Sequence, residues 1–217
     1  MRKSFDRRVL PERVLGFIRR CQERVPCHLG GGAALAGAYL SHRTTGDVDL
    51  FFHDGDEMRI LVGALSDIAT GAGMKSEILR DARSLVRARI GSGEAATELD
   101  LVHEPQEDVE PPPAPLEGIV VESLVDLRAA KLTCILSRSE PRDLVDLYFL
   151  DRAGHAPEED LGAALRKDAG IDPGVLAWLL ASFPTEPLPS MLLPISSEEL
   201  RRFRDELAER LRRAAIP

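Results

Sequence analysis

The chain has 217 residues, 44% of them hydrophobic, which is enough for one large domain or two small ones with a real core. A formal net charge of −8 argues against tight, unaided wrapping of a nucleic-acid backbone, although it leaves a nucleic-acid acceptor open. Because no stretch approaches the roughly 20 apolar residues of a membrane helix and the N-terminus lacks the apolar run of a signal peptide, we expect a cytoplasmic protein.

The first half of the chain alternates between predicted helices and strands. Apolar residues at helical spacing predict a helix over residues 11–25, and a run of small residues predicts a second helix over residues 33–40. A third helix is predicted between the turns at residues 54–56 and 71–73. Alternating or short apolar runs predict strands over residues 27–29, 47–53, 76–79, 85–90 and 97–103. The glycines of residues 30–32 predict a tight turn between the first strand and the helix of small residues.

A proline-rich segment at residues 110–115 is stiff and extended, so we expect the boundary between two regions, 1–115 and 116–217, at this point. One more strand is predicted over residues 118–121. Helices are then predicted over residues 123–137, 141–150, 158–168, 173–182 and 197–215. We expect Trp178 to lie in the core of its helix. The pattern predicts an α+β fold, with a mixed sheet flanked by helices and followed by a helical C-terminal region.

Cysteines and histidines give no sign of a metal site. Cys21, Cys27 and Cys134 are odd in number and form no CxxC pair, so we expect buried apolar residues and neither a disulfide framework nor a zinc site. The histidines lack metal-ligand spacing, and His42 and His53 are expected to be bystanders.

Two carboxylates, Asp47 and Asp49, stand two residues apart in a strand whose alternate positions are apolar, so both point to the same face. Like charges that close require a shared proton or a divalent cation with oxygen ligands. Asp100 lies on a later strand with the same alternation. The three aspartates therefore predict a site for Mg²⁺ or Mn²⁺, the alternative being that they line an ordinary solvated face.

The glycine turn at Gly31 and Gly32 leads into a helix, where unpartnered backbone amides can bind a phosphate. Neither a dinucleotide-binding GxGxxG motif, which Leu35 interrupts, nor a P-loop is present. A phosphate cradle beside three carboxylates suits in-line nucleotidyl transfer, because two metal ions about 4 Å apart can hold a nucleoside triphosphate and neutralise the leaving pyrophosphate.

An ordered set of motifs resembles the nucleotidyltransferases of the AbiEii/AbiGii toxin family, a branch of the DNA polymerase β-like superfamily. The matching positions span roughly residues 28–150 and are Gly31-Gly32-Ala33, Arg43 and Thr45, Asp47-Val48-Asp49, Asp126 with Lys131, and Arg142-Asp143 with Asp146. Two positions depart from the family pattern. Ala33 replaces a hydroxyl residue, and Thr97 stands where a Lys often precedes the third carboxylate.

The resemblance implies a nucleotidyltransferase-like fold and a role for each matching position. Asp47 and Asp49 would bind the metal, Asp100 would complete the site and align or deprotonate the acceptor hydroxyl, and Lys131 would hold phosphates, with the helical region completing the site. The positions expected to bind the nucleotide are Gly31, Gly32, Ala33, Arg43, Asp126, Arg142, Asp143 and Asp146.

From the residues alone, the roles of Lys131 and of the Arg142, Asp143 and Asp146 motif each have two interpretations. Lys131 lies on an otherwise apolar helix flank, so its partner is a nucleotide phosphate or an Asp. Asp143 and Asp146 share a helix face at spacing i, i+3, and Arg142 reaches Asp146 at i, i+4. These three residues form part of the site or an internal ion-pair network that locks helices together.

By resemblance, the expected function is that of the toxin of a type IV toxin–antitoxin pair, which transfers a nucleotide from an NTP to an RNA such as tRNA, or to a protein, with release of pyrophosphate. A cognate antitoxin is an expected partner. The alternatives are a degenerate nucleotide-binding regulatory module and an adenylyltransferase acting on a small molecule of the aminoglycoside type. Acidic net charge favours a small cationic acceptor, while the arginine-rich last helix leaves room for RNA.

Overall fold

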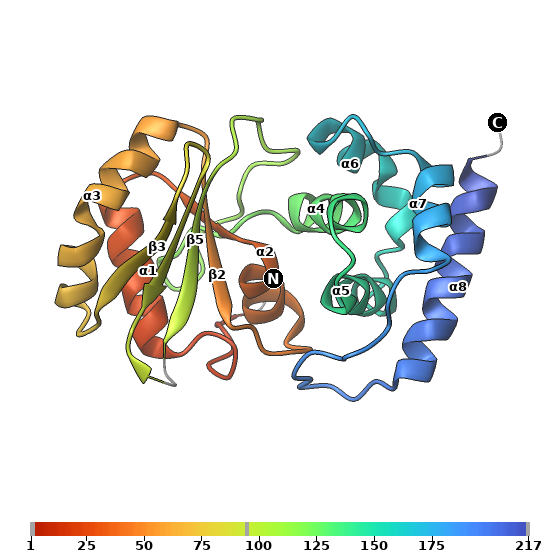
Figure 1. Cartoon of the computed structure of the whole chain (residues 1–217), viewed down its shortest axis with the longest axis horizontal. Coiled ribbons are helices and arrows are strands. Elements are labelled where there is room, and N and C mark those ends of the chain that lie inside the picture. Colours follow the sequence, from red (N-terminus) through yellow and green to blue (C-terminus); the bar gives the residue numbers. More distant parts are fainter. Residues whose placement is uncertain (1–2, 94–95, 216–217) are drawn as a thin grey trace. The chain divides into compact units, whose positions relative to one another are not determined.

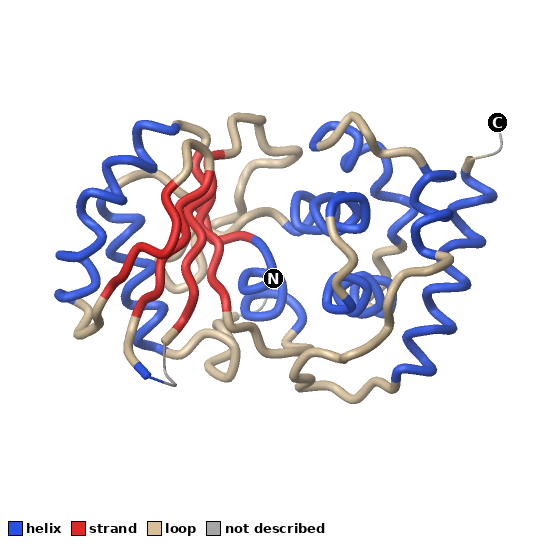
Figure 2. Tube along the Cα trace, viewed as in Figure 1, coloured by secondary structure: helices blue, strands red, loops and turns tan. Residues whose placement is uncertain are grey.

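A computed structural model describes residues 3–93 and 96–215 of the chain. The chain forms two compact units, Met1–Ser123 and Leu124–Pro217 (Figure 1). The strands of the described residues all belong to the first unit, whereas the second is built from helices and connecting loops (Figure 2). The α+β fold class expected from the sequence is confirmed.

The first unit is organised around a five-stranded mixed sheet in the order β1-β2-β5-β4-β3. Its strands are β1 (His28–Gly30), β2 (Asp47–Phe52), β3 (Ser76–Asp81), β4 (Leu85–Ile90) and β5 (Thr97–His103). Strands β2 and β5 run parallel, and every other neighbouring pair is antiparallel. Strand β5 thus lies between β2 and β4, which brings the two acidic strands side by side.

Helices cover the two faces of this sheet. Helices α1 (Glu12–Arg24) and α3 (Gly55–Gly71) lie on one side, and α2 (Gly31–Ala34) lies on the other (Figure 1). The apolar positions of β2 and β5 are buried in the core, together with the apolar stripes of α1 and α3. Burying each such large aliphatic side chain is worth about 1.5–3 kcal/mol. The alternation seen in the sequence therefore sets which sheet face is apolar.

The segment after β1 differs in detail from the predicted turn and helix. Helix α2 already begins at Gly31, and it continues into a π-helix, η1 (Leu35–Leu40). The helix ends at Ser41, whose backbone is left-handed with φ 54°. Small residues permit close packing here, since a Cβ atom on Gly37 would lie 2.7 Å from Leu10 Cδ1.

The strand predicted at residues 118–121 is wrong. The region makes only two isolated bridges, Leu116 with Ile119 and Leu29 with Val121. Glu117 and Gly118 have positive φ angles of 49° and 78°, which turn the chain back instead of extending it. The backbone is satisfied by a side chain, because the Gln22 amide donates to the Val120 carbonyl at 2.9 Å and accepts from the Val120 N–H at 2.8 Å.

The second unit consists of packed helices. They are α4 (Leu124–Ser137), α5 (Pro141–Arg152), the 3₁₀-helix η3 (Pro157–Asp160), α6 (Leu161–Lys167), α7 (Pro173–Leu180) and α8 (Ser197–Ala214). Ser196 and Glu199 form a capping box at the start of α8, which satisfies orphan amides there. Helix α4 packs against α5 and α6, and α7 packs against α8.

The exposure of Trp178 and of the three cysteines can be compared with what the sequence predicted. Trp178 is 73% exposed, so its predicted place in the core is wrong; α7 buries Leu176, Ala177 and Leu180 instead. Cys21 is buried as expected, while Cys27 and Cys134 are only partly buried, and all three are free thiols. Among the described helices, none combines the length and apolarity needed to cross a bilayer.

Candidate active site

The turn from β1 into α2 is shaped around two side chains of the predicted site. Gly31 has a left-handed backbone with φ +60°, and a Cβ atom there would collide with Asp49 Oδ2. A Cβ atom on Gly32 would lie 2.7 Å from Arg43 Nη2. The two glycines therefore leave space that the Asp49 carboxylate and the buried Arg43 guanidinium fill.

The three predicted metal ligands share one face of the sheet. Asp49 is paired with Asp100 in the parallel register of β2 and β5, and Asp47 is paired with Glu98. Each aspartate is partly exposed, whereas the residues between them are buried. The structure thus places Asp49 and Asp100 on neighbouring strands with their side chains on the polar face, as a carboxylate site requires.

Neighbouring side chains hold the carboxylates of Asp47 and Asp100. The Thr45 hydroxyl donates to Asp47 Oδ1, and Arg87 of β4 donates from Nε and Nη2 to the two oxygens of Asp100, each at 2.7 Å. The Asp100 carboxylate raises the pKa of Arg87 above its ordinary value, chiefly through these hydrogen bonds. A cation that bound Asp100 would have to compete with Arg87 for its oxygens.

Sequence reasoning missed Arg87. The signal was present in the alternation of residues 85–90, which places Arg87 and Arg89 on one face of the strand. The alternation does not reveal the order of the strands in the sheet, and only the pairing of β4 with β5 puts Arg87 opposite Asp100.

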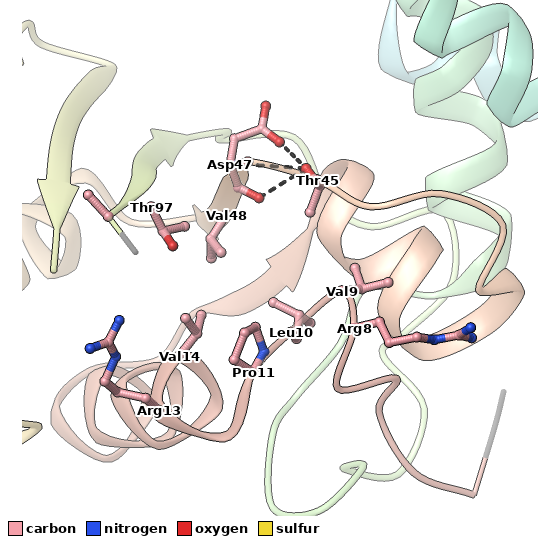
Figure 3. Close-up of a pocket in the computed structure, with 12 residues that line it drawn as sticks. Arg8, Val9, Leu10, Pro11, Arg13, Val14, Thr45, Asp47, Val48 and Thr97 are labelled. Carbon is pink, nitrogen blue, oxygen red and sulfur yellow. Dashed lines mark hydrogen bonds between the residues drawn. The ribbon is translucent and has the colours of Figure 1, made fainter. Parts of the chain in front are cut away.

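A cavity of about 480 Å³ opens beside Asp47 (Figure 3). Its polar lining includes Thr45, Asp47 and Thr97, with Arg8 and Arg13 from the N-terminal segment, and apolar residues of that segment complete the wall. This volume is in the range of small-molecule sites. Val48 points into this cavity, whereas the Asp47 carboxylate points away from it, so the cavity lies on the opposite face of β2 from the predicted metal ligands (Figure 3).

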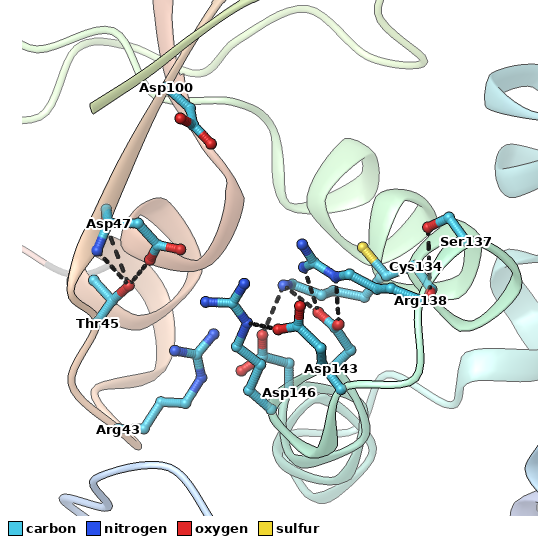
Figure 4. Close-up of polar contacts among 12 residues, drawn as sticks. Arg43, Thr45, Asp47, Asp100, Cys134, Ser137, Arg138, Asp143 and Asp146 are labelled. Atoms are coloured by element: carbon cyan, nitrogen blue, oxygen red, sulfur yellow. Dashed lines mark hydrogen bonds and ion pairs between the residues drawn. The ribbon is translucent and has the colours of Figure 1, made fainter. Parts of the chain in front are cut away.

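In the second unit, Lys131 is part of a buried ion-pair network with Asp143 and Asp146. Figure 4 labels these two aspartates and Arg138, which binds Asp143. The Nζ of Lys131 lies 3.1 Å from Asp143 Oδ1 and 2.8 Å from Asp146 Oδ2, and both aspartate side chains are fully buried. Arg138 binds Asp143 through Nε at 2.7 Å and Nη2 at 2.9 Å. Burial would raise the pKa of Asp143, but Lys131 and Arg138 outweigh it and hold the pKa below its ordinary value.

The remaining predicted positions of this unit also have charged partners. Asp126 is buried and lies 3.1 Å from Lys167 Nζ. Arg142 Nε lies 2.5 Å from Glu140 Oε2. Arg138 and Lys167 were not foreseen. Arg138 lies just beyond the end of α4 and Lys167 is the last residue of α6, and sequence spacing links neither of them to the motif. An ion-pair network around Lys131, one of the two readings left open by the sequence, is therefore present.

Comparison with known proteins finds a matching family model and solved structures with a similar fold. The family model described as "Nucleotidyl transferase AbiEii toxin, Type IV TA system" matches residues 16–216. The structure is similar to JHP933 from Helicobacter pylori, with a TM-score of 0.59 and 21% identity over 95% of this chain and 94% of that one. It is also similar to MenT4, a nucleotidyltransferase toxin from Mycobacterium tuberculosis, with a TM-score of 0.59 and 14% identity over 93% and 85% of the two chains. A search of curated proteins finds no match.

Proposed function

Because this chain belongs to the AbiEii family of nucleotidyltransferase toxins of type IV toxin–antitoxin systems, we propose that it transfers a nucleotide from an NTP to an RNA acceptor with the help of a divalent metal. The chain is a nucleotidyltransferase; the metal, the NTP preference and the acceptor are the parts proposed. A cognate antitoxin is the corresponding proposed partner.

One observation supports the metal part most strongly. Asp49 and Asp100 face each other across parallel strands, and Gly31 has no side chain where Asp49 passes it. Carboxylate oxygens are the ligands that Mg²⁺ prefers, so the donor set fits this ion or Mn²⁺. We assign Asp47, Asp49 and Asp100 to it.

When bound, the metal would polarise the phosphoryl oxygens and neutralise charge on the departing pyrophosphate. The chain's own residues supply the rest. Asp100 orients or deprotonates the acceptor hydroxyl, and the backbone around Gly31 and Gly32, with Arg43 behind it, binds the phosphates. In this proposal Lys131 binds a phosphate, and its ammonium group is held in place by Asp143 and Asp146.

An RNA acceptor is favoured by the surface of α8. Arg201, Arg202, Arg212 and Arg213 are all exposed on this helix. Arg212 and Arg213 pair with Glu209, at 3.0 Å and 3.8 Å, while Arg201 and Arg202 place two adjacent cationic side chains near the start of the helix. Phosphate backbones bind to such surfaces. A protein or a small cationic molecule is the alternative acceptor that the experiment below distinguishes.

The test uses the full chain with each α-labelled NTP, Mg²⁺ and either total RNA, total protein or an aminoglycoside. We expect label in RNA and one pyrophosphate per transfer. Asp49→Asn should lower the rate by at least about 100-fold, because a metal ligand contributes several kcal/mol to transition-state stabilisation. Asp67→Asn, at an exposed position of α3, is the matched control. Undiminished transfer by the Asp49 variant would refute the site assignment.

A further inference from the structure

A second group of metal-ligating side chains lies on the first unit, apart from the three aspartates. His28 belongs to β1, His53 follows the end of β2, and Asp108 lies in the loop after β5. One ligand atom from each of these residues lies within 4.8 Å of those of the other two. Residues from three separate segments therefore converge on one point.

The His53 ring is oriented for metal binding. Its Nδ1 lies 3.0 Å from the Glu104 carbonyl oxygen. Because a carbonyl can only accept, Nδ1 carries the hydrogen in this pair, and Nε2 of the neutral ring presents a lone pair. Such a backbone bond to one nitrogen is the usual outer partner of a histidine that binds metal through the other.

His53 Nε2 faces Asp108 Oδ2 at 3.4 Å. A lone pair opposite a carboxylate oxygen requires a cation or a proton between them. In a tetrahedral zinc site the bond lengths of about 2.0–2.1 Å place neighbouring ligand atoms about 3.3 Å apart. The separation of these two atoms already matches that value.

The surroundings fit a bound cation that keeps an open coordination position. His28 is only 5% exposed, and its ring stacks on Phe51 with centroids 5.7 Å apart and an interplanar angle of 12°. A cavity of about 340 Å³ is lined by the three ligands and by Glu57, so a second carboxylate adds negative charge. The site is held by packing on one side and open on the other.

We propose that His28, His53 and Asp108 bind a transition-metal ion of the Zn²⁺ class, at a site separate from the Asp47, Asp49 and Asp100 carboxylates. Two imidazoles and one carboxylate form a donor set that suits Zn²⁺ and discriminates against Mg²⁺, which prefers oxygen ligands alone. The bound ion ties the loop that contains Asp108 to the ends of β1 and β2. It thereby stabilises the fold of the first unit.

The test is metal binding by the chelator-treated full chain. We expect one equivalent of Zn²⁺ to bind, Co²⁺ to give the visible d–d absorption of a low-coordinate site, and Zn²⁺ to raise Tm. His53→Ala and Asp108→Asn should each weaken Zn²⁺ binding by at least about tenfold and remove the Co²⁺ spectrum.

Two control variants locate the ion. Cys27→Ser changes the lining of the same cavity without removing one of the three ligands, and Asp49→Asn removes a carboxylate of the other site. Both should bind Zn²⁺ like the unmodified chain. The proposal is overturned if Zn²⁺ does not bind, or if it binds equally well to the folded His53 and Asp108 variants. Loss of binding in Asp49→Asn alone would place the ion at the sheet carboxylates and would equally overturn it.

Discussion

Gly31 shows how a single residue can serve both the backbone and the site. Its φ of +60° is a conformation that L side chains rarely adopt, and its missing side chain makes room for Asp49. Gly73 has a similar φ of +69°, but no atom lies within 4 Å of the Cβ position there. This pair separates the cost of backbone strain from the cost of displacing the carboxylate.

Gly31→Ala should therefore lower stability and transfer together. We expect a loss of about 1–2 kcal/mol from the left-handed backbone, and about a 100-fold slower transfer because Asp49 must move. Gly73→Ala should show the stability loss alone. Chemical denaturation and the transfer assay measure the two effects, and equal activity of both variants would contradict the role of Asp49's position.

Arg87 and Asp100 give a second test at the residue scale. Arg87→Ala frees both oxygens of Asp100, so Mg²⁺ or Mn²⁺ should bind more tightly. Because the arginine is about half exposed, solvent screens the pair and we expect a gain of only about two- to fivefold. Calorimetric titration measures the affinity. Arg89→Ala, whose partner is Glu77 at 3.5 Å, should leave it unchanged, and weaker binding by the Arg87 variant would speak against competition.

At the scale of elements, the contacts between α4 and α5 depend on buried charge. Asp143 joins Lys131 and Arg138, and all but Arg138 are almost completely buried. Removing one partner of such a pair leaves an uncompensated charge, which typically costs about 3–5 kcal/mol. The network is thus expected to matter for folding whatever its part in catalysis.

Asp143→Asn should destabilise the chain by about 3 kcal/mol at neutral pH. Since the pKa of Asp143 is lowered on folding, its contribution is present above its unfolded pKa of about 3.9 and is lost as the pH falls through the lower folded value. The difference in stability between the unmodified chain and the variant should therefore shrink below about pH 4. Urea denaturation from pH 3 to pH 7 measures it, with Asp67→Asn as the control. A difference that does not change with pH would contradict the assigned ion pairs.

The sequence predicted helices and strands correctly where the apolar periodicity was strong, and it failed where long-range contacts determined the local structure. The spacing of apolar residues predicted α1, β2, β4 and β5 to within about two residues at each end. Residues 118–121 also looked like a strand, yet Gln22 from α1 satisfies the backbone there and no neighbouring strand pairs with it along its length. Trp178 was misplaced because α7 turns its apolar face to α8 and leaves the indole outside.

At the scale of the whole molecule, the distribution of charge determines which surface could bind an RNA acceptor. The chain carries −8 overall, while α8 exposes Arg201 and Arg202 in its first turns. If this helix contacts RNA, Arg201→Gln with Arg202→Gln should weaken RNA binding and reduce the slope of log K against log salt by about 0.7 for each lost phosphate contact. Filter binding across a salt series measures this slope. The same double change at Arg80 and Arg83 is the control, and an unaltered slope for the α8 variant would exclude the surface.

The sequence by itself determined the local parts of this protein: the elements with strong periodicity, the shared face of Asp47 and Asp49, and the family motifs. Local periodicity carries this information, since side-chain direction repeats every two residues in a strand and every 3.6 in a helix. The tertiary structure alone decided that β5 lies next to β2, and thus that Asp100 pairs with Asp49 and receives Arg87. It also assembled His28, His53 and Asp108, because packing joins segments whose spacing along the chain follows no repeat.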